Sequence, residues 1–465
     1  MKLKTLVSAM ALAAAANVAA TDTYSDFPVT VKGYKGDAKH SVAYTGQAAR
    51  QVLHNSLKKL AGKGNGHPNA ELKAQMLAYF AGKDAGREII SPATKGDFVI
   101  AEKSVDELSK GKNLAGKTYK GAVPGWPGNM TGPEVIAFMI DKASAANKGY
   151  DPLTGYDYTQ LISKFAMGAV FYNQAVDNYL DEKLAADNKP NNKPYKAGKP
   201  YTGKEHVWDE AFGYFGAPAH ALALSPKQAY SIAKLKADAF ALADADKDGE
   251  VSLYDEMVYA HAYYAAGADK SGKTNYFHTI MQAFIDGRQL ITDAKGEALT
   301  DSQRQKLKGY AKIIADNWEK VIAEAVFKYA GSTYKDLKAL EELIENNGDA
   351  SKAFRKYAKH WGELKGFALA LQAGKNNLGE TAVKLNRLIG YGPVLLGNTQ
   401  VTGIDANGNY VQSSSTNMKE YMLHMLKVQK LMVDEFGVEA RSKDVMADLG
   451  SLADKLSSGA SVEND

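Results

Sequence analysis

A short acidic stretch at residues 244–256 has the spacing of a loop that binds a hard cation. It reads Asp-Ala-Asp-Lys-Asp-Gly-Glu-Val-Ser-Leu-Tyr-Asp-Glu. Because Ca²⁺ takes six to eight oxygen ligands, alternating acids followed by a glycine are the pattern that lets one loop surround it. Gly249 permits a sharp turn, so the backbone carbonyl of Glu250 can join the carboxylates. The predicted calcium ligands are Asp244, Asp246, Asp248, Glu250, Ser252 and either Asp255 or Glu256.

This spacing is that of an EF-hand-like calcium loop, with one departure at its end. Acids stand at loop positions 1, 3 and 5, glycine at 6 and a hydroxyl at 9, but position 12 holds Asp255 where the standard loop has Glu. Either Asp255 closes the ligand shell with a shorter side chain, or Glu256 closes it in a slightly stretched loop. No second loop of this spacing is available to pair with it, which indicates a structural calcium rather than a sensor. The alternative is an acidic turn that binds no metal.

A second kind of chemistry is offered by a predicted helix at residues 203–216. Helical winding places His206, Asp209 and Glu210 on one face, opposite an apolar face that contains Trp208. Gly213 lies on the same polar face, and a glycine inside a helix costs about 1 kcal/mol against alanine. We therefore expect another part of the chain to approach closely there. The alternative for the histidine and acids is a solvated helix face.

A similar turn occurs in the predicted helix at 350–372, where His360 and Glu363 are one helical turn apart. Imidazole and carboxylate together suit iron or zinc, whereas calcium prefers an all-oxygen site. We expect the two turns to meet across a helix interface and to bind one transition metal through His206, Asp209 or Glu210, His360 and Glu363. The alternative for His360 is a histidine that is hydrogen-bonded within the packing of its helix.

The start of the chain predicts export. Residues 1–20 combine two lysines, an apolar alanine-rich run and Val-Ala-Ala before Thr21, which is the pattern of a secretory signal peptide. No later stretch is long and apolar enough for a membrane span. The chain has no cysteine, so disulfides and a lipid anchor near the cleavage site are excluded. We expect a soluble periplasmic protein.

The charge of the chain limits the classes of partner it can bind, and its length shows that it can form a large core. Lys and Arg number 57 and Asp and Glu 53, giving a formal charge of +4. This near balance argues against a nucleic acid or an anionic membrane as partner. A mature chain of this length can bury a large core without disulfides.

The elements that must position these residues are almost all helical. Periodic apolar residues predict helices near residues 41–60, 72–80, 134–146, 158–184, 203–216, 225–242, 276–291, 300–329, 334–346, 350–372, 378–389, 418–436 and 443–456. The acidic loop is expected to have a helix on each side, the one before it being the helix at 225–242. Strand-like alternation is nearly absent, apart from one hairpin candidate around 405–408.

The remaining segments divide the chain. Residues 21–40 form an N-terminal arm, 92–133 a long irregular excursion over the surface, and 457–465 a frayed tail. The segment 187–200 is rich in proline, asparagine and lysine and is typical of a linker between two lobes. The lobes would cover about 41–186 and 205–456.

Several motifs give the chain a resemblance to the imelysin-like proteins of bacterial envelopes. It is most similar to a related Gram-negative family of exported proteins of unknown function. The matching segments are 44–47, 205–216, the acidic loop, 284–288, 365–370 and 390–393. The resemblance implies an all-α fold of two packed helical bundles over 41–456 and an association with iron uptake. The imelysin motif Gly-x-His-x-x-Glu is only partly present, since Gly203 is three residues before His206 and Asp209 replaces the Glu.

Three functions fit these residues. The first is a periplasmic metal-binding protein without catalysis, accessory to iron acquisition, with metal ions and an envelope protein as partners. The second is a calcium-stabilised helical interaction module without a second metal. The third is a metallopeptidase. Two observations argue against it: the chain lacks the motif His-Glu-x-x-His, and it has no Ser or Cys nucleophile in a recognisable context.

Overall fold

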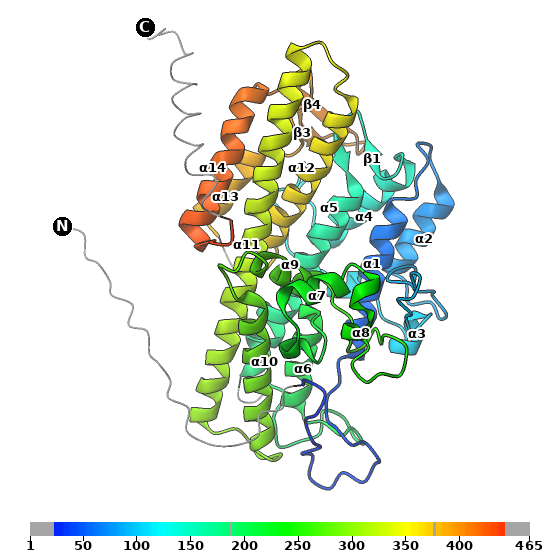
Figure 1. Ribbon diagram of the computed structural model, residues 1–465, viewed down its shortest axis with the longest axis vertical. Helices are drawn as coiled ribbons and strands as arrows, with labels where there is room; N and C mark the ends of the chain where they lie inside the picture. The colour runs from blue at the N-terminus through cyan, green and yellow to red at the C-terminus, as the bar shows by residue number, and fades with distance from the viewer. Residues whose placement is uncertain (1–22, 186–187, 375–377, 442–465) are drawn as a thin grey trace, which may run out of the picture.

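The computed structural model describes residues 23–185, 188–374 and 378–441, and its fold is all-α as predicted. The helices form an elongated body, with α11 running through both its lower and its upper half (Figure 1). The lower half contains α6 and α10, and the upper half contains α12, α13 and α14. The predicted signal peptide, the predicted helix at 443–456 and the predicted tail lie outside the described residues.

The first half of the chain follows the predicted helices closely. Its elements are α1 (Thr45–Ala61), α2 (Ala70–Phe80), α3 (Val105–Leu108), η1 (Ala115–Lys117), α4 (Gly132–Ala145), α5 (Tyr158–Ala166), η2 (Met167–Tyr179) and η3 (Glu182–Leu184). The helix predicted at 158–184 changes character midway, because η2 is a π-helix that continues α5 directly. Such a long π-helix is rare, and π-helical turns are often found at functional sites.

The second half contains the longest helices. Its elements are α6 (Gly203–Phe215), η4 (Ala221–Ala223), α7 (Pro226–Ile232), η5 (Ala237–Ala239), α8 (Phe240–Ala243), α9 (Ala260–Asp269), α10 (Tyr276–Asp293), α11 (Asp301–Glu345), α12 (Ser351–Leu371), α13 (Glu380–Ile389) and α14 (Met418–Phe436). Capping boxes fix the starts of several helices, among them Thr202 with Glu205 at α6 and Ser225 with Gln228 at α7.

Two helix predictions were wrong. The helix predicted at 225–242 ends at Ile232, because Leu235 adopts a φ of +49°, which a right-handed helix cannot contain. The separate helices predicted at 300–329 and 334–346 are one helix, α11. Gly331 does not interrupt it, since Gln429 of α14 packs against the bare glycine and donates a 3.1 Å hydrogen bond to the carbonyl of Phe327.

The segment 92–133 has little regular structure, as predicted, but it is not a loose surface excursion. Phe98, Ile100, Val105 and Trp126 are all buried. The N-terminal arm is also fixed to the body, because the ring of Tyr24 stacks on that of Phe212 in α6 at 3.7 Å. Apolar side chains without helical spacing therefore anchor both segments.

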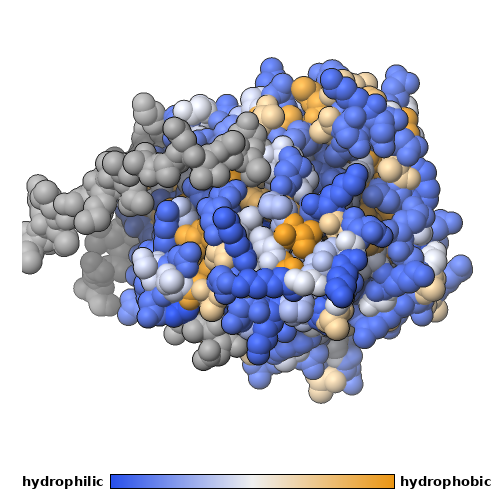
Figure 2. Space-filling view, turned by 90° about the horizontal axis from the view of Figure 1, so that it is seen from below, coloured by the Kyte–Doolittle hydropathy of each residue, from blue (hydrophilic) through white to orange (hydrophobic). Residues whose placement is uncertain are grey.

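Strands are few in the described residues. The predicted hairpin is confirmed as β3 (Thr399–Ile404) paired antiparallel with β4 (Tyr410–Ser414), and an unpredicted short pair joins β1 (Tyr150–Asp151) to β2 (Tyr156–Asp157). The lower end of the molecule is mostly hydrophilic on the face in view, with apolar side chains in small separate groups (Figure 2). Among the described helices, none has both the length and the apolar character needed to cross a bilayer.

Candidate metal centre

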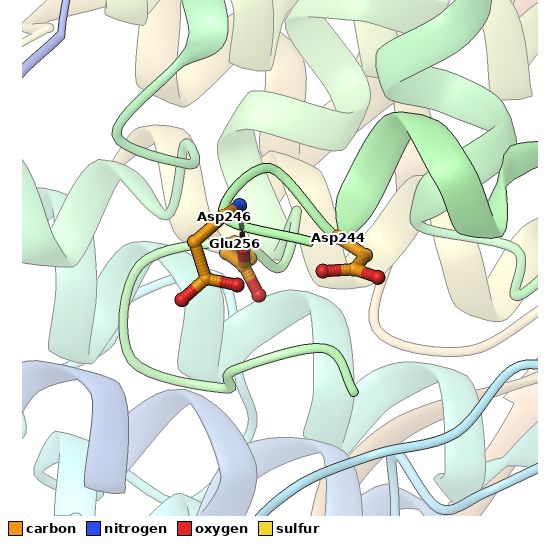
Figure 3. A group of neighbouring side chains, drawn as sticks. All are labelled: Asp244, Asp246 and Glu256. Atoms are coloured by element: carbon orange, nitrogen blue, oxygen red, sulfur yellow. Dashed lines mark hydrogen bonds between the residues drawn. The ribbon is translucent and has the colours of Figure 1, made fainter. Parts of the chain in front are cut away.

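The loop between α8 and α9 brings three carboxylates together. Oxygen atoms of Asp244, Asp246 and Glu256 all lie within 4.8 Å of one another (Figure 3). Within residues 23–185, 188–374 and 378–441, this is the one group of three or more histidine, cysteine or acidic side chains that is close enough to share an ion. Asp244 and Asp246 are ligands predicted from the sequence, and Glu256 is one of the two residues predicted to close the ligand shell.

Glu256, rather than Asp255, points back into the loop. Its Oε1 accepts hydrogen bonds from the backbone N–H groups of Ala245, at 2.7 Å, and Asp246, at 3.3 Å. Its Oε2 accepts from the N–H of Ser252 at 2.8 Å. The Asp255 side chain is instead hydrogen-bonded to Ser252. Of the two alternatives left open by the sequence, the geometry favours closure by Glu256.

Asp244 has an oxygen that lacks a hydrogen-bond partner. Its side chain is only 8% exposed, and its Oδ2 accepts a 3.2 Å hydrogen bond from the N–H of Gly249. Its Oδ1 is buried and has no hydrogen-bond partner. A buried, unsatisfied carboxylate oxygen is costly, and a cation beside it would remove that cost. Gly249 itself has a φ of +93°, so the turn requires glycine.

Two of the other predicted ligands are more exposed than Asp244 and Glu256. Asp248 and Glu250 are exposed, and Asp248 Oδ1 accepts a 2.9 Å hydrogen bond from the N–H of Glu250. The loop is held against the 92–133 segment, because Val251 forms a parallel bridge with Ile100. The N–H of Leu253 also donates to Glu102 at 2.8 Å. Contacts far apart in the sequence thus keep the loop in shape.

The helices that flank this loop differ from the helix–loop–helix that the sequence predicts. On one side α8 has only four residues, and on the other side α9 begins at Ala260, four residues after Glu256. Helices therefore do lie on both sides of the loop, as predicted, but the helix before it is one short turn because the chain is broken near Leu235. The loop thus has the acid spacing of an EF-hand but not the two long helices that flank the loop in an EF-hand.

His206 lies in an aromatic pocket of its own. Its ring is 4.2 Å from that of Tyr195 and 4.6 Å from that of Tyr201, and its Nε2 is 3.9 Å from Glu210 Oε1. Burial lowers the pKa of His206, so the imidazole is neutral at pH 7. Glu210 Oε1 also accepts a 3.0 Å hydrogen bond from Nε2 of Gln47 in α1.

His360 has different partners. Its Nδ1 is 2.5 Å from Asp336 Oδ2 of α11, and Glu363 is hydrogen-bonded to Tyr329. The two histidine turns share no partner, and α6 lies in the lower half whereas α12 lies in the upper half (Figure 1). The structure therefore does not bring His206 and His360 to one ion. Each turn packs against its own neighbours, which was the alternative for His360.

Asp209 is part of a buried ion cluster around Arg288 of α10. The fully buried guanidinium donates to Asp209 Oδ1 at 2.9 Å and to Glu205 Oε1 at 3.1 Å. Tyr24 and the N–H of Ala43 also donate to Asp209, each at 3.0 Å. Burial, together with the neighbouring Glu205, raises the pKa of Asp209 to about 6, although Arg288 opposes this shift. Asp209 is thus engaged inside the fold and is not free to bind a metal.

Sequence reasoning missed Glu205 and Arg288 as members of this cluster. A signal was present, because Arg288 falls on the apolar stripe of its helix between Phe284 and Ile291. A cation at such a position requires buried acids as partners. The expected close approach at Gly213 is confirmed, since a Cβ there would lie 2.7 Å from that of Gln47.

The comparisons with known proteins give one match. The model of a family described as "Domain of unknown function (DUF4856)" matches residues 133–388. This range includes α4 apart from its first residue, the helices from α5 to α12, the acidic loop, both histidine turns and Arg288. No curated protein and no solved structure matches the chain significantly.

Proposed function

The chain belongs to the DUF4856 family, whose function is unknown, and we propose that it is a calcium-binding helical protein of the bacterial envelope without a catalytic role. One observation carries the proposal. Asp244, Asp246 and Glu256 converge in the loop after α8, and a buried oxygen of Asp244 has no hydrogen-bond partner there. Carboxylate oxygens are the ligands that calcium prefers.

The calcium ion has a structural role in this proposal. Its ligands are Asp244, Asp246 and Glu256, supplemented by Asp248, the carbonyl of Glu250 and the hydroxyl of Ser252 as the sequence predicts. Because Val251 is paired with Ile100, an ion in the loop also stabilises the attachment of the 92–133 segment. The ion thereby joins two segments that are far apart in the chain.

The envelope location is supported by the signal-like residues 1–20 and by the resemblance to the imelysin-like proteins. The association with iron acquisition is supported by that resemblance alone. Since His206 and His360 have separate partners, the favoured form of the proposal is the calcium-stabilised interaction module without iron or zinc at these turns.

Isothermal titration of metal-depleted protein with calcium tests the proposal. We expect one calcium ion per chain, bound in preference to magnesium, and loss of binding in Asp244→Asn. The exposed Asp316 of α11 provides a matched control, and Asp316→Asn should bind as the wild type does. Absence of calcium binding, or equal binding by Asp244→Asn, would overturn the proposal.

A further inference from the structure

A cavity of about 600 Å³ lies beside the acidic loop but is separate from it. Its wall is built by α1, α5, α9 and α12, together with the turn after α7 and the segment that follows Glu256. This volume is within the range of about 300–1,000 Å³ that small-molecule sites occupy. The wall also includes Met167, where α5 passes into the π-helix η2.

The wall of this cavity is strongly cationic. It contains one acid, Glu363, among the charged side chains that face it. The cations are Lys58, Lys59, Lys63, Lys164 and Lys234. Such an excess of one sign in a confined space concentrates the electrostatic potential and attracts ions of the opposite sign.

Two of these lysines are in direct contact. Lys164 of α5 is 4% exposed, and its side-chain amine lies beside that of Lys58 in α1. Burial and the charge of Lys58 lower the pKa of Lys164 well below its usual range. Glu363, the one acid on the cavity wall, is hydrogen-bonded to Tyr329. An anion bound between the two amines would favour the protonated form of both, because its negative charge offsets their mutual repulsion.

Aromatic rings hold the cations in place around the cavity. Lys164 lies over the ring of Tyr264 at 5.3 Å, and Lys234 lies over the ring of Tyr263 at 4.7 Å. A ring face attracts an ammonium group but leaves N–H groups free to donate elsewhere. Lys234 is exposed and stands at the outer side, whereas Lys164 is buried at the inner side. The lysines therefore line the cavity from its interior to its rim.

We propose that this cavity binds a small, multiply charged oxyanion, with Lys58 and Lys164 as the inner ligands and Lys234 at the rim. The ligand class is a phosphoryl or polycarboxylate compound of small-molecule size, recognised through its anionic oxygens. Lysine donates as a point charge rather than as a planar fork, so the site selects for charge more than for bidentate geometry. This inference does not depend on the calcium site.

Titration of metal-depleted protein with pyrophosphate and with citrate, at an ionic strength held constant with sodium chloride, tests the proposal. We expect saturable binding of at least one of the two, which also distinguishes phosphoryl from carboxylate recognition. Lys164→Met and Lys234→Ala should each weaken binding about tenfold or more, the loss expected for one charge-assisted hydrogen bond. Lys308→Met, at an exposed position of α11 outside the cavity, should bind as the wild type does.

A stability measurement separates a loss of binding from a loss of folding. Without added anion, Lys164→Met should unfold at a temperature no lower than the wild type, because it removes a buried amine that carries a desolvation cost and repels Lys58 when protonated. The anion should then stabilise the wild type but not this variant. The proposal is overturned if neither anion binds, or if both cavity variants bind as tightly as the control.

Discussion

The acids of α6 and the acids of the loop after α8 are accommodated in two different ways. Glu205 and Asp209 have a counter-cation within the chain, because Arg288 donates to both inside the core. Asp244, Asp246 and Glu256 have backbone N–H groups as donors, and one oxygen of Asp244 has none. A set of acids is thus a candidate metal site only where the fold does not supply the cation itself.

The largest expected loss of folding stability comes from removing the guanidinium of Arg288 from the buried ion cluster. Arg288→Met keeps the length of the side chain but leaves Glu205 and Asp209 buried without a cation, which should destabilise the protein by about 3–5 kcal/mol. Urea unfolding measures this loss. Arg304→Met, which removes an arginine paired with the exposed Asp301, should cost less than about 1 kcal/mol. Similar losses in the two variants would show that the buried cluster is not a distinct environment.

The second effect is a pH dependence that comes from Asp209. Its pKa of about 6 in the folded protein exceeds the ordinary value of 3.8, so the folded state binds a proton more readily than the unfolded state. The free energy of unfolding that this group contributes should therefore fall as pH rises from about 4 to 6, by on the order of 3 kcal/mol.

The comparison of wild type with Asp209→Asn isolates this group, because every other titration is common to both. Unfolding free energies measured between pH 4 and 7 should show the wild type losing stability relative to the variant as pH rises. Parallel curves would mean that Asp209 ionises normally despite its burial.

The third effect is the response of the loop to an external cation. Calcium at a hundredfold excess over its dissociation constant should stabilise the folded state by about 2.7 kcal/mol. Urea unfolding with calcium and with a chelator measures the difference. Asp209→Asn should respond as the wild type does, because its cluster already has Arg288. An equal response to magnesium would contradict a calcium site, since magnesium demands a different geometry.

The smallest effect is the change in the free energy of unfolding caused by Asp246→Asn, which should have opposite signs in calcium-free and calcium-bound protein. In calcium-free protein, Asp246→Asn removes like-charge repulsion from the loop and should stabilise by about a few tenths of a kcal/mol. With saturating calcium the same change removes a ligand and should destabilise relative to the wild type. Thermal unfolding under both conditions measures the reversal. The same sign under both conditions would indicate that Asp246 does not contact the ion.

The sequence predicted most of the helices, because their apolar stripes are regular over several turns. It also identified the acids of the loop, since their spacing is local. It could not decide between Asp255 and Glu256, because that choice depends on which side chain accepts the N–H groups of Ala245 and Ser252 after the chain has turned.

The ion cluster escaped prediction for a different reason. Its members come from the N-terminal arm, α6 and α10, so their contact depends on tertiary packing and not on spacing. The spacing of His206 and Asp209 predicts that they share a helical face. What that face contacts could not be read from it.

The continuity of α11 has a mechanical consequence. At 1.5 Å per residue its 45 residues form a rod of about 68 Å that no loop interrupts. The lower and upper halves therefore cannot swing about a flexible joint along this rod, since any rotation of one half must bend the rod or carry the other half with it. Tyr329, which lines the cationic cavity, stands in the second half of the rod. A displacement of α11 at this point would therefore move the whole helix, and with it the packing in both halves of the molecule.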